Sequence, residues 1–293
     1  MIVLSYLLMG YDVENYLDPY LNKDLDWEVT LRFLSRMRRV HEDLNVPCTL
    51  FICGRLLEES HVLKALENLA GSQLFDLQQH TYSHQRLKTV VQNDGEMVAV
   101  FRGASLEEIR KEVTRTNKLF EERLGIHCRG ICGPYGYYRG LMDRPDILKV
   151  LYKAGIRFTR TYLRNENDWG PLSIKVQPFT YGPQGFPQIL EIPSQGWQDI
   201  IYFRANGWNK REEFLRYSKN MVDEIAQKDL IWSVCQHDWT SCQKDAEMGY
   251  TRALLDYAQS NRITIISHRA CYEKTMGIHL PIDSRAPETG NLS

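Results

Sequence analysis

The chain has 293 residues, of which 43% are hydrophobic and 25% charged, with 36 basic against 37 acidic side chains. A formal net charge of -1 excludes a polybasic surface for nucleic acid or anionic lipid, and no stretch has the roughly 18 apolar residues of a membrane helix. We therefore expect a globular protein without nucleic-acid or membrane partners, built as one large α/β domain or two average ones.

The first predicted elements form a β-α-β unit. Residues 2–10 are an apolar run followed by polar side chains at 11–16, which is typical of a buried strand. Residues 26–45 carry apolar side chains at helical spacing, with Asp26 as the expected N-cap. Residues 46–53 are apolar and β-branched, which predicts a second strand.

The alternation of helices and strands continues to the end of the chain. Helical patterns cover residues 62–70, 105–124, 146–154, 210–228 and 248–260. Strand patterns cover residues 73–79, 126–132, 156–162, 189–192, 230–236 and 263–267, whereas residues 164–187 lack a clear period. This alternation favours a parallel sheet covered by helices. We predict a distorted, incomplete (β/α) barrel of about seven parallel strands, with one domain over residues 1–280 and a polar tail at 281–293.

The cysteines and the N-terminus predict a cytoplasmic protein. The seven cysteines are odd in number and form no CxxC pair, which favours reduced thiols. Met1 is followed at once by the apolar residues 2–10, with no basic segment and no small-residue cleavage site. We therefore interpret residues 2–10 as a strand and not as a signal peptide.

Three strand ends carry side chains suited to metal binding and acid–base chemistry. His80 and His84 follow the strand at 73–79, and two imidazoles four residues apart on a helical turn can bind one cation. Asp12 and Glu14 follow the first strand, where one carboxylate can complete a metal site and the other can act as a base. His237 ends a later strand. Each motif alone also fits a surface pair, a capping pair or a structural histidine, but strand ends in a barrel meet at one edge.

The order of these motifs resembles the polysaccharide deacetylase family, whose NodB-homology domains remove acetyl groups from N-acetylated sugars with a divalent metal. The similar segments run from about residue 2 to about residue 275. They comprise residues 45–54, the histidine motif at 76–84, a third motif at 130–136, residues 190–193 and the strand that ends at His237.

The resemblance implies roles for individual residues. His80 and His84 would bind the metal, with a carboxylate of the first motif as third ligand. The commonest first motif has adjacent aspartates, whereas Asp12 and Glu14 are separated by one residue, as in a variant branch. We expect Asp12 to be the base and Glu14 the ligand, and leave an exchange of these roles open. His237 would be the general acid, and the backbone N–H of Tyr135 would hold the oxyanion.

Two histidines and a carboxylate make zinc the first expectation for the metal, with cobalt, nickel, manganese and iron as alternatives. One departure from the family concerns the arginine that pairs with the base, because Cys132 stands at its position. Arg129 or Arg139 would substitute for it, or the pKa of Asp12 would be less depressed. We interpret Cys132 as a buried structural residue and not as a nucleophile.

The sequence thus predicts a metal-dependent hydrolase of a carbon–nitrogen amide bond, with deacetylation of an N-acetylated sugar or saccharide as the leading reaction. A hydrolase of a small cyclic imide, ureide or other non-sugar amide is the first alternative. A non-catalytic carbohydrate-binding relative is the second. Homo-oligomerisation is left open. Several aromatic residues would form either core or pocket wall, namely Trp169, Tyr181, Phe186, Trp197, Trp208 and Trp239.

Overall fold

The computed structural model describes residues 5–15, 27–243 and 245–280. The predicted N-cap Asp26 and the predicted tail at 281–293 lie outside the described residues.

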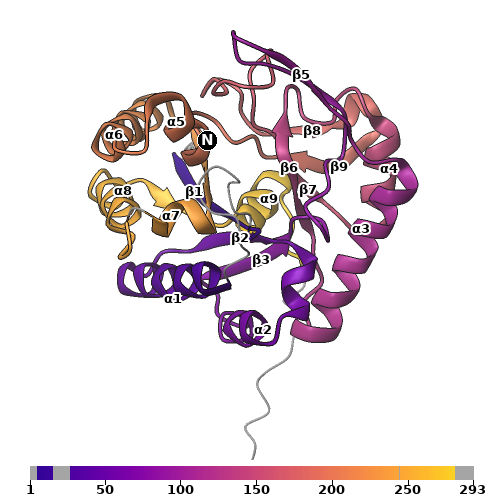
Figure 1. Ribbon diagram of the computed structural model, residues 1–293, viewed down its shortest axis with the longest axis horizontal. Helices are drawn as coiled ribbons and strands as arrows, with labels where there is room; N and C mark the ends of the chain where they lie inside the picture. Colours follow the sequence, from indigo (N-terminus) through magenta and orange to yellow (C-terminus); the bar gives the residue numbers. More distant parts are fainter. Residues whose placement is uncertain (1–4, 16–26, 244, 281–293) are drawn as a thin grey trace, which may run out of the picture.

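A curved, mostly parallel sheet forms the centre of the molecule (Figure 1). Its seven consecutive parallel strands lie in the order β10-β1-β2-β3-β6-β7-β9 and are β10 (Ile231–His237), β1 (Tyr6–Val13), β2 (Cys48–Ile52), β3 (Phe75–Gln79), β6 (Gly130–Tyr137), β7 (Phe158–Tyr162) and β9 (Phe186–Glu191). Antiparallel β8 (Phe179–Tyr181) extends the β9 edge, and β11 (Thr264–Ile265) pairs with β1. Among the described strands the sheet does not close, so the predicted incomplete barrel is confirmed.

Amphipathic helices cover the outside of the sheet (Figure 1). They are α1 (Trp27–Leu44), α2 (Ser60–Glu67), α3 (Leu106–Leu119), α4 (Pro145–Lys153), α6 (Arg211–Lys228) and α8 (Gly249–Ser260). Helix α3 begins with the predicted capping box, in which Ser105 and Glu108 each accept a backbone N–H of the other. A π-helical turn, Phe120–Leu124, continues it and fulfils the prediction of one helix over 105–124.

A further helix, α9 (His268–Met276), lies within the ring of strands in the view of Figure 1. Its Cys271 and Tyr272 belong to an inner apolar cluster that contains Leu8 of β1 and Phe158 of β7. Burial of these side chains fills the interior of the barrel, so the sheet is a packed core and not a pore.

Some segments differ from the predicted elements. The hairpin of β4 (Val90–Asn93) and β5 (Val98–Phe101) was not predicted, nor were β8, α5 (Asp199–Asn206), α7 (Asp238–Gln243) and α9. Helix α5 is mostly buried, so apolar side chains occupy consecutive positions and no helical spacing is visible. Strand β6 begins at Gly130, four residues later than predicted, because the Gln78 side chain accepts the backbone N–H groups of Arg129 and Gly130.

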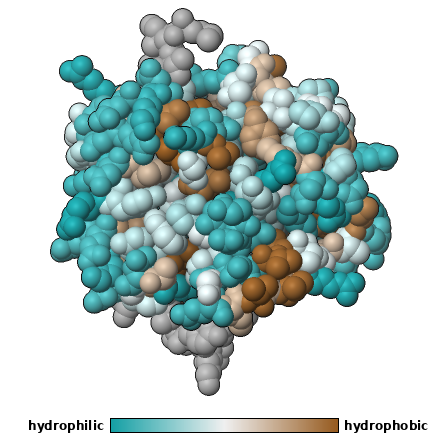
Figure 2. All heavy atoms as spheres, turned by 90° about the horizontal axis from the view of Figure 1, so that it is seen from above, coloured by the Kyte–Doolittle hydropathy of each residue, from teal (hydrophilic) through white to brown (hydrophobic). Residues whose placement is uncertain are grey.

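The surface agrees with the balanced composition. The face shown in Figure 2 is mostly hydrophilic, with separate small apolar patches. No helix within the described ranges is long and apolar enough to cross a membrane. All seven cysteines lie in the described residues, and they are buried and form no disulfide, in agreement with the reduced thiols that the odd number and the spacing favour.

Candidate active site

The two histidines of the predicted metal site lie in the loop that leaves β3. The predicted helical turn is wrong, because residues 80–84 form an irregular loop in which Thr81 and His84 have φ angles of 59° and 63°. This loop still brings the two imidazole rings together, with their centroids 4.9 Å apart. The left-handed backbone at Thr81 and His84, and not helical periodicity, therefore directs both rings to the same point.

Glu14 completes a three-residue cluster with these histidines. Its Oε2 lies 2.7 Å from Nε2 of His84 and 3.5 Å from Nε2 of His80. One ligand atom from each residue lies within 4.8 Å of the other two. The second oxygen, Oε1, accepts a hydrogen bond of 3.1 Å from the indole of Trp239. The cluster therefore presents two imidazole nitrogens and one oriented carboxylate oxygen.

The protonation pattern of His80 fits a metal ligand. Its Nδ1 lies 2.9 Å from the carbonyl oxygen of Cys132, which can only accept, so Nδ1 carries the proton. In the neutral, metal-binding form of the ring, Nε2 then presents a lone pair, and this buried atom has no hydrogen-bond partner among the described residues. Burial lowers the pKa of His80, but Cys132 and the carboxylates of Asp12 and Glu14 together outweigh it and raise the pKa well above its usual range. The position thus favours a positive charge, which a divalent cation would supply.

Asp12 is paired with an arginine that the sequence interpretation missed. Arg160 of β7 is fully buried and donates a hydrogen bond to Oδ1 of Asp12, so neither Arg129 nor Arg139 fills this role. Cys132 and Arg160 are register partners in β6 and β7, and the Cys132 Sγ lies 3.2 Å from Nη2 of Arg160. The arginine therefore comes from the neighbouring strand.

The Arg160 pair decides the ionisation of Asp12. Burial alone would raise the pKa of Asp12, but Arg160, His80 and His237 together lower it below its ordinary value. Asp12 is therefore ionised at neutral pH, as a general base must be. The pKa of Asp12 is thus lowered by Arg160, although Cys132 stands at the position of the family's arginine.

His237 faces Asp12 from the other side of the site. The two residues are register partners in β10 and β1, and Nε2 of His237 lies 3.9 Å from Oδ2 of Asp12. Asp199, the first residue of α5, contacts Nδ1 of His237 at 2.6 Å. Burial lowers the pKa of His237, but the Asp199 carboxylate dominates and raises it to about 9. His237 is therefore a positively charged imidazolium, with both ring nitrogens protonated, at neutral pH.

Tyr135 lies on a strained turn within β6. Its φ of 70° is left-handed, and Gly136 follows with a φ of 65°. A Cβ atom on Gly136 would lie 2.6 Å from Cβ of Leu163, so only glycine fits there. The Tyr135 ring contacts the ring of His84, with centroids 5.0 Å apart, and Arg86 lies 3.5 Å above it. These contacts place the Tyr135 backbone at the wall of the site.

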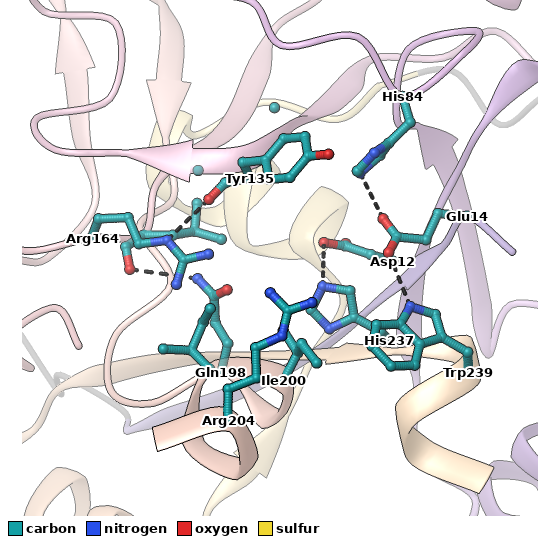
Figure 3. Close-up of a pocket in the computed structure, with 14 residues that line it drawn as sticks. Asp12, Glu14, His84, Tyr135, Arg164, Gln198, Ile200, Arg204, His237 and Trp239 are labelled. Atoms are coloured by element: carbon teal, nitrogen blue, oxygen red, sulfur yellow. Dashed lines mark hydrogen bonds and ion pairs between the residues drawn. The ribbon is translucent and has the colours of Figure 1, made fainter. Parts of the chain in front are cut away.

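A cavity of about 60 Å³ connects these groups (Figure 3). Asp12, Glu14, His84 and His237 line it, together with the Tyr135 turn and apolar residues such as Ile200. Of the six aromatic residues weighed above, Trp239 lines this cavity, whereas Tyr181 is fully buried in a core cluster. The structure thus brings all six predicted site residues, including His80, to one place at the carboxyl edge of the sheet.

Sequence reasoning missed two polar partners, Arg160 and Asp199, and only Arg160 shows a pattern that could have revealed it. Arg160 is a charged residue in the middle of a strand of aromatic residues and threonines, and a charged residue in a buried strand indicates an ion pair. Asp199 begins a helix without helical spacing and gave no comparable signal. Both act by contact with a residue that was identified.

These features define the class of protein: a barrel-like α/β protein with a carboxylate–histidine cluster at the carboxyl ends of its strands. Residues 30–159 match the family model described as polysaccharide deacetylase. Over this range, the match confirms the resemblance to polysaccharide deacetylases that the motif order predicts. The match includes His80, His84 and Tyr135.

Solved structures share the fold at low sequence identity. A putative polysaccharide deacetylase from Mycobacterium smegmatis has a TM-score of 0.63 at 16% identity, over 97% of this chain and 94% of that one. Puue allantoinase has a TM-score of 0.64 at 14% identity, over 93% and 89%. A CE4 family pseudoenzyme from Bacillus anthracis has a TM-score of 0.52 at 12% identity, over 94% and 67%. No curated protein matched the sequence.

Proposed function

We propose that the protein is a metal-dependent hydrolase of a carbon–nitrogen amide bond, and that the leading reaction is deacetylation of an N-acetylated sugar or saccharide. The observation that carries the proposal is the fixed tautomer of His80, whose unsatisfied Nε2 lies 3.5 Å from Glu14 and 3.9 Å from Asp12. The polysaccharide deacetylase match supports the reaction class.

Glu14, His80 and His84 would hold the metal, with zinc the expected ion and cobalt, nickel, manganese or iron as alternatives. When bound, such an ion acidifies a water molecule and polarises the amide carbonyl. The contacts favour Glu14 as the ligand and Asp12 as the base, because Glu14 is the closer of the two to both imidazoles of the pair.

The chain's own residues supply the proton transfers. Asp12, ionised and held by Arg160, accepts a proton from the attacking water. His237, protonated and held by Asp199, donates a proton to the departing nitrogen. The backbone N–H of Tyr135 would stabilise the oxyanion, a contribution of roughly 3 to 4 kcal/mol for one good donor. Water and amide thus become a carboxylic acid and an amine as the carbon–nitrogen bond breaks.

A small cyclic imide or ureide is the second candidate substrate, and the size of the cavity favours it. The cavity of about 60 Å³ is far below the roughly 300 to 1,000 Å³ of pockets for drug-sized ligands. A non-catalytic binding role is less well supported, because an ionised base and a protonated acid would then be buried together without a use.

Two assays distinguish these functions. Zinc-loaded protein is tested for acetate release from N-acetylglucosamine compounds and for ring opening of small cyclic imides and ureides. We expect turnover on one panel, and a loss of at least about 100-fold in kcat for Asp12→Asn and His237→Gln. Absence of turnover on both panels, with saturable saccharide binding, would instead support the binding module.

We also propose that the protein works in the cytoplasm. Seven buried cysteines without a disulfide support this proposal, because they are compatible with a reducing environment.

A further inference from the structure

Arg164 is a buried cation on the wall of the active-site cavity. The residue is 7% exposed, and its Nε donates a hydrogen bond of 3.0 Å to the carbonyl oxygen of Tyr135. Figure 3 shows its guanidinium between Tyr135 and Gln198, on the side of the cavity away from Glu14 and His84. One guanidinium nitrogen is therefore engaged, while the side chain still lines the cavity.

The charge of Arg164 is not neutralised by an ion pair. Among the described residues no carboxylate lies within 4 Å of its guanidinium, and Asp168 and Asp12 act on it only from a greater distance. Burial and the like charge of Arg204, which lines the same cavity, lower the pKa of Arg164 to about 10, so it remains charged at neutral pH. Burying an unpaired cation is costly, which favours an anion at this place when the site is filled.

The site's own carboxylates cannot supply that anion, because each has another partner. Asp12 pairs with Arg160 and Asp199 with His237, and Glu14 contacts the imidazoles of His80 and His84 and would hold the metal. A divalent cation held by Glu14 would add further positive charge to the same cavity. The positive charge of Arg164 is therefore left for a bound ligand to balance.

We propose that Arg164 anchors a carboxylate of the substrate, so that the amide cleaved at this site belongs to a small molecule that also carries a carboxylate group. The inference rests on the proposed function and narrows its substrate class. Apolar neighbours such as Ile200 and Ile201 lower the local dielectric and strengthen this ion pair. Because Nε of Arg164 binds the Tyr135 carbonyl, the anchor is held at a fixed position relative to the turn that faces the reacting carbonyl.

The test compares carboxylates with matched neutral amides. Affinities of zinc-loaded protein for N-acetylglycine, N-acetyl-β-alanine and 4-acetamidobutanoate, and for their primary carboxamides, are measured by calorimetry; the three chain lengths vary the separation of amide and carboxylate. We expect at least one acid to bind about 10-fold or more tightly than its carboxamide. In Arg164→Gln this ratio should fall towards one, and Arg164→Lys should retain part of it.

Arg123→Gln is the matched control. It removes an exposed arginine in the π-helical turn that does not line the cavity, so the ratio of the two affinities should stay unchanged. Equal affinity for acids and carboxamides, or a preference that survives in Arg164→Gln, would overturn the proposal; the latter result would place the carboxylate on the metal. Turnover of amides without an acid preference would refute the anchor alone. An acid preference without turnover of any amide would refute the hydrolase and leave the anchor in place.

Discussion

At the scale of single residues, the site is organised by pairs in which one side chain sets the charge of another. Asp199 raises the pKa of His237 to about 9, against the effect of burial, and Arg160 lowers the pKa of Asp12. A base that is ionised and an acid that is protonated at the same pH are what amide hydrolysis requires.

The first prediction concerns His237 and its partner. Activity of the wild type should fall as the pH rises through about 9, because His237 then loses the proton that it donates. In Asp199→Asn, burial dominates, the pKa of His237 falls, and the alkaline limb of the kcat profile should move to lower pH. Asp223→Asn on α6, which removes a carboxylate that accepts from Tyr257, is the control. An unchanged alkaline limb in Asp199→Asn would contradict the role of His237.

The second prediction concerns the buried pair of Arg160 and Asp12. Arg160→Met leaves the Asp12 carboxylate buried without its partner, and should lower the free energy of unfolding at pH 7 by about 3 to 5 kcal/mol. The pKa of Asp12 should rise, so the acid limb of the activity profile moves to higher pH. Denaturant unfolding and pH–rate profiles measure the two effects.

The double variant Asp12→Asn/Arg160→Met serves as the control for this pair, since it removes both charges. It should regain part of the lost stability while remaining inactive. In the wild type, the pKa of Asp12 is lower in the folded protein than in the unfolded chain, where it is near 4. The ionised pair therefore stabilises the fold above about pH 4, and this stabilisation is lost as the pH falls from there through the lowered pKa. Unchanged stability in Arg160→Met at pH 7 would contradict the pairing.

Residue types and their position after strands were sufficient to select Asp12, Glu14, His80, His84 and His237, which the structure brings to one place. The partner of Asp12 was not identified, because a sequence gives no register between strands. Only the alignment of β6 with β7 places Arg160 opposite Cys132 and within reach of Asp12. The histidine loop was misjudged for a similar reason: helical spacing and a left-handed loop can both direct two rings to one point.

At the scale of elements, strands β1, β7 and β10 enclose the Arg160 side chain in a very narrow space. A Cβ atom on Gly10 of β1 would lie 2.7 Å from Nη1 of Arg160 and 3.1 Å from the carbonyl oxygen of Val234 in β10. Because glycine has no side chain, this position leaves the space in which the Arg160 guanidinium lies beside Asp12.

The third prediction follows from this crowding. Gly10→Ala should lower the free energy of unfolding by about 1 to 3 kcal/mol, as overpacking does, and should reduce kcat because Arg160 is displaced from Asp12. Gly182→Ala is the control, because its nearest neighbours would lie 3.5 Å away or more. Thermal unfolding and kcat report the two effects. Equal behaviour of the two variants would show that the space beside Gly10 does not position Arg160.

Elements with strong periodicity were predicted well, and those without it were not. Helix α3 has a capping box and an amphipathic face, so its start at Leu106 follows from the sequence. Helix α5, which carries Asp199, is buried on most sides and shows no such period. The part of the site that depends on α5 was therefore hidden from sequence reasoning.

At the scale of the whole molecule, the site gathers residues from nearly the full length of the described chain. Asp12 and His237 are 225 residues apart in the sequence and are register partners in adjacent strands. Loss of the fold would separate the proposed metal ligands, so metal binding and folding should be coupled.

The fourth prediction measures this coupling. Zinc at about 100 times its dissociation constant should stabilise the wild type by about 2.7 kcal/mol and raise Tm by several degrees. The shift should disappear in His80→Ala/His84→Ala, while exposed His127→Ala should retain it as the control. An equal rise in Tm for all three proteins would mean that zinc binds elsewhere.

The most direct test of the central claim is the metal content of the purified protein after zinc loading and dialysis. We predict close to one zinc ion per chain in the wild type and in Asp12→Asn, and almost none in His80→Ala/His84→Ala or in Glu14→Gln. Loss in Asp12→Asn with retention in Glu14→Gln would exchange the roles of the two carboxylates. Equal metal content in the wild type and His80→Ala/His84→Ala would contradict the metal site altogether.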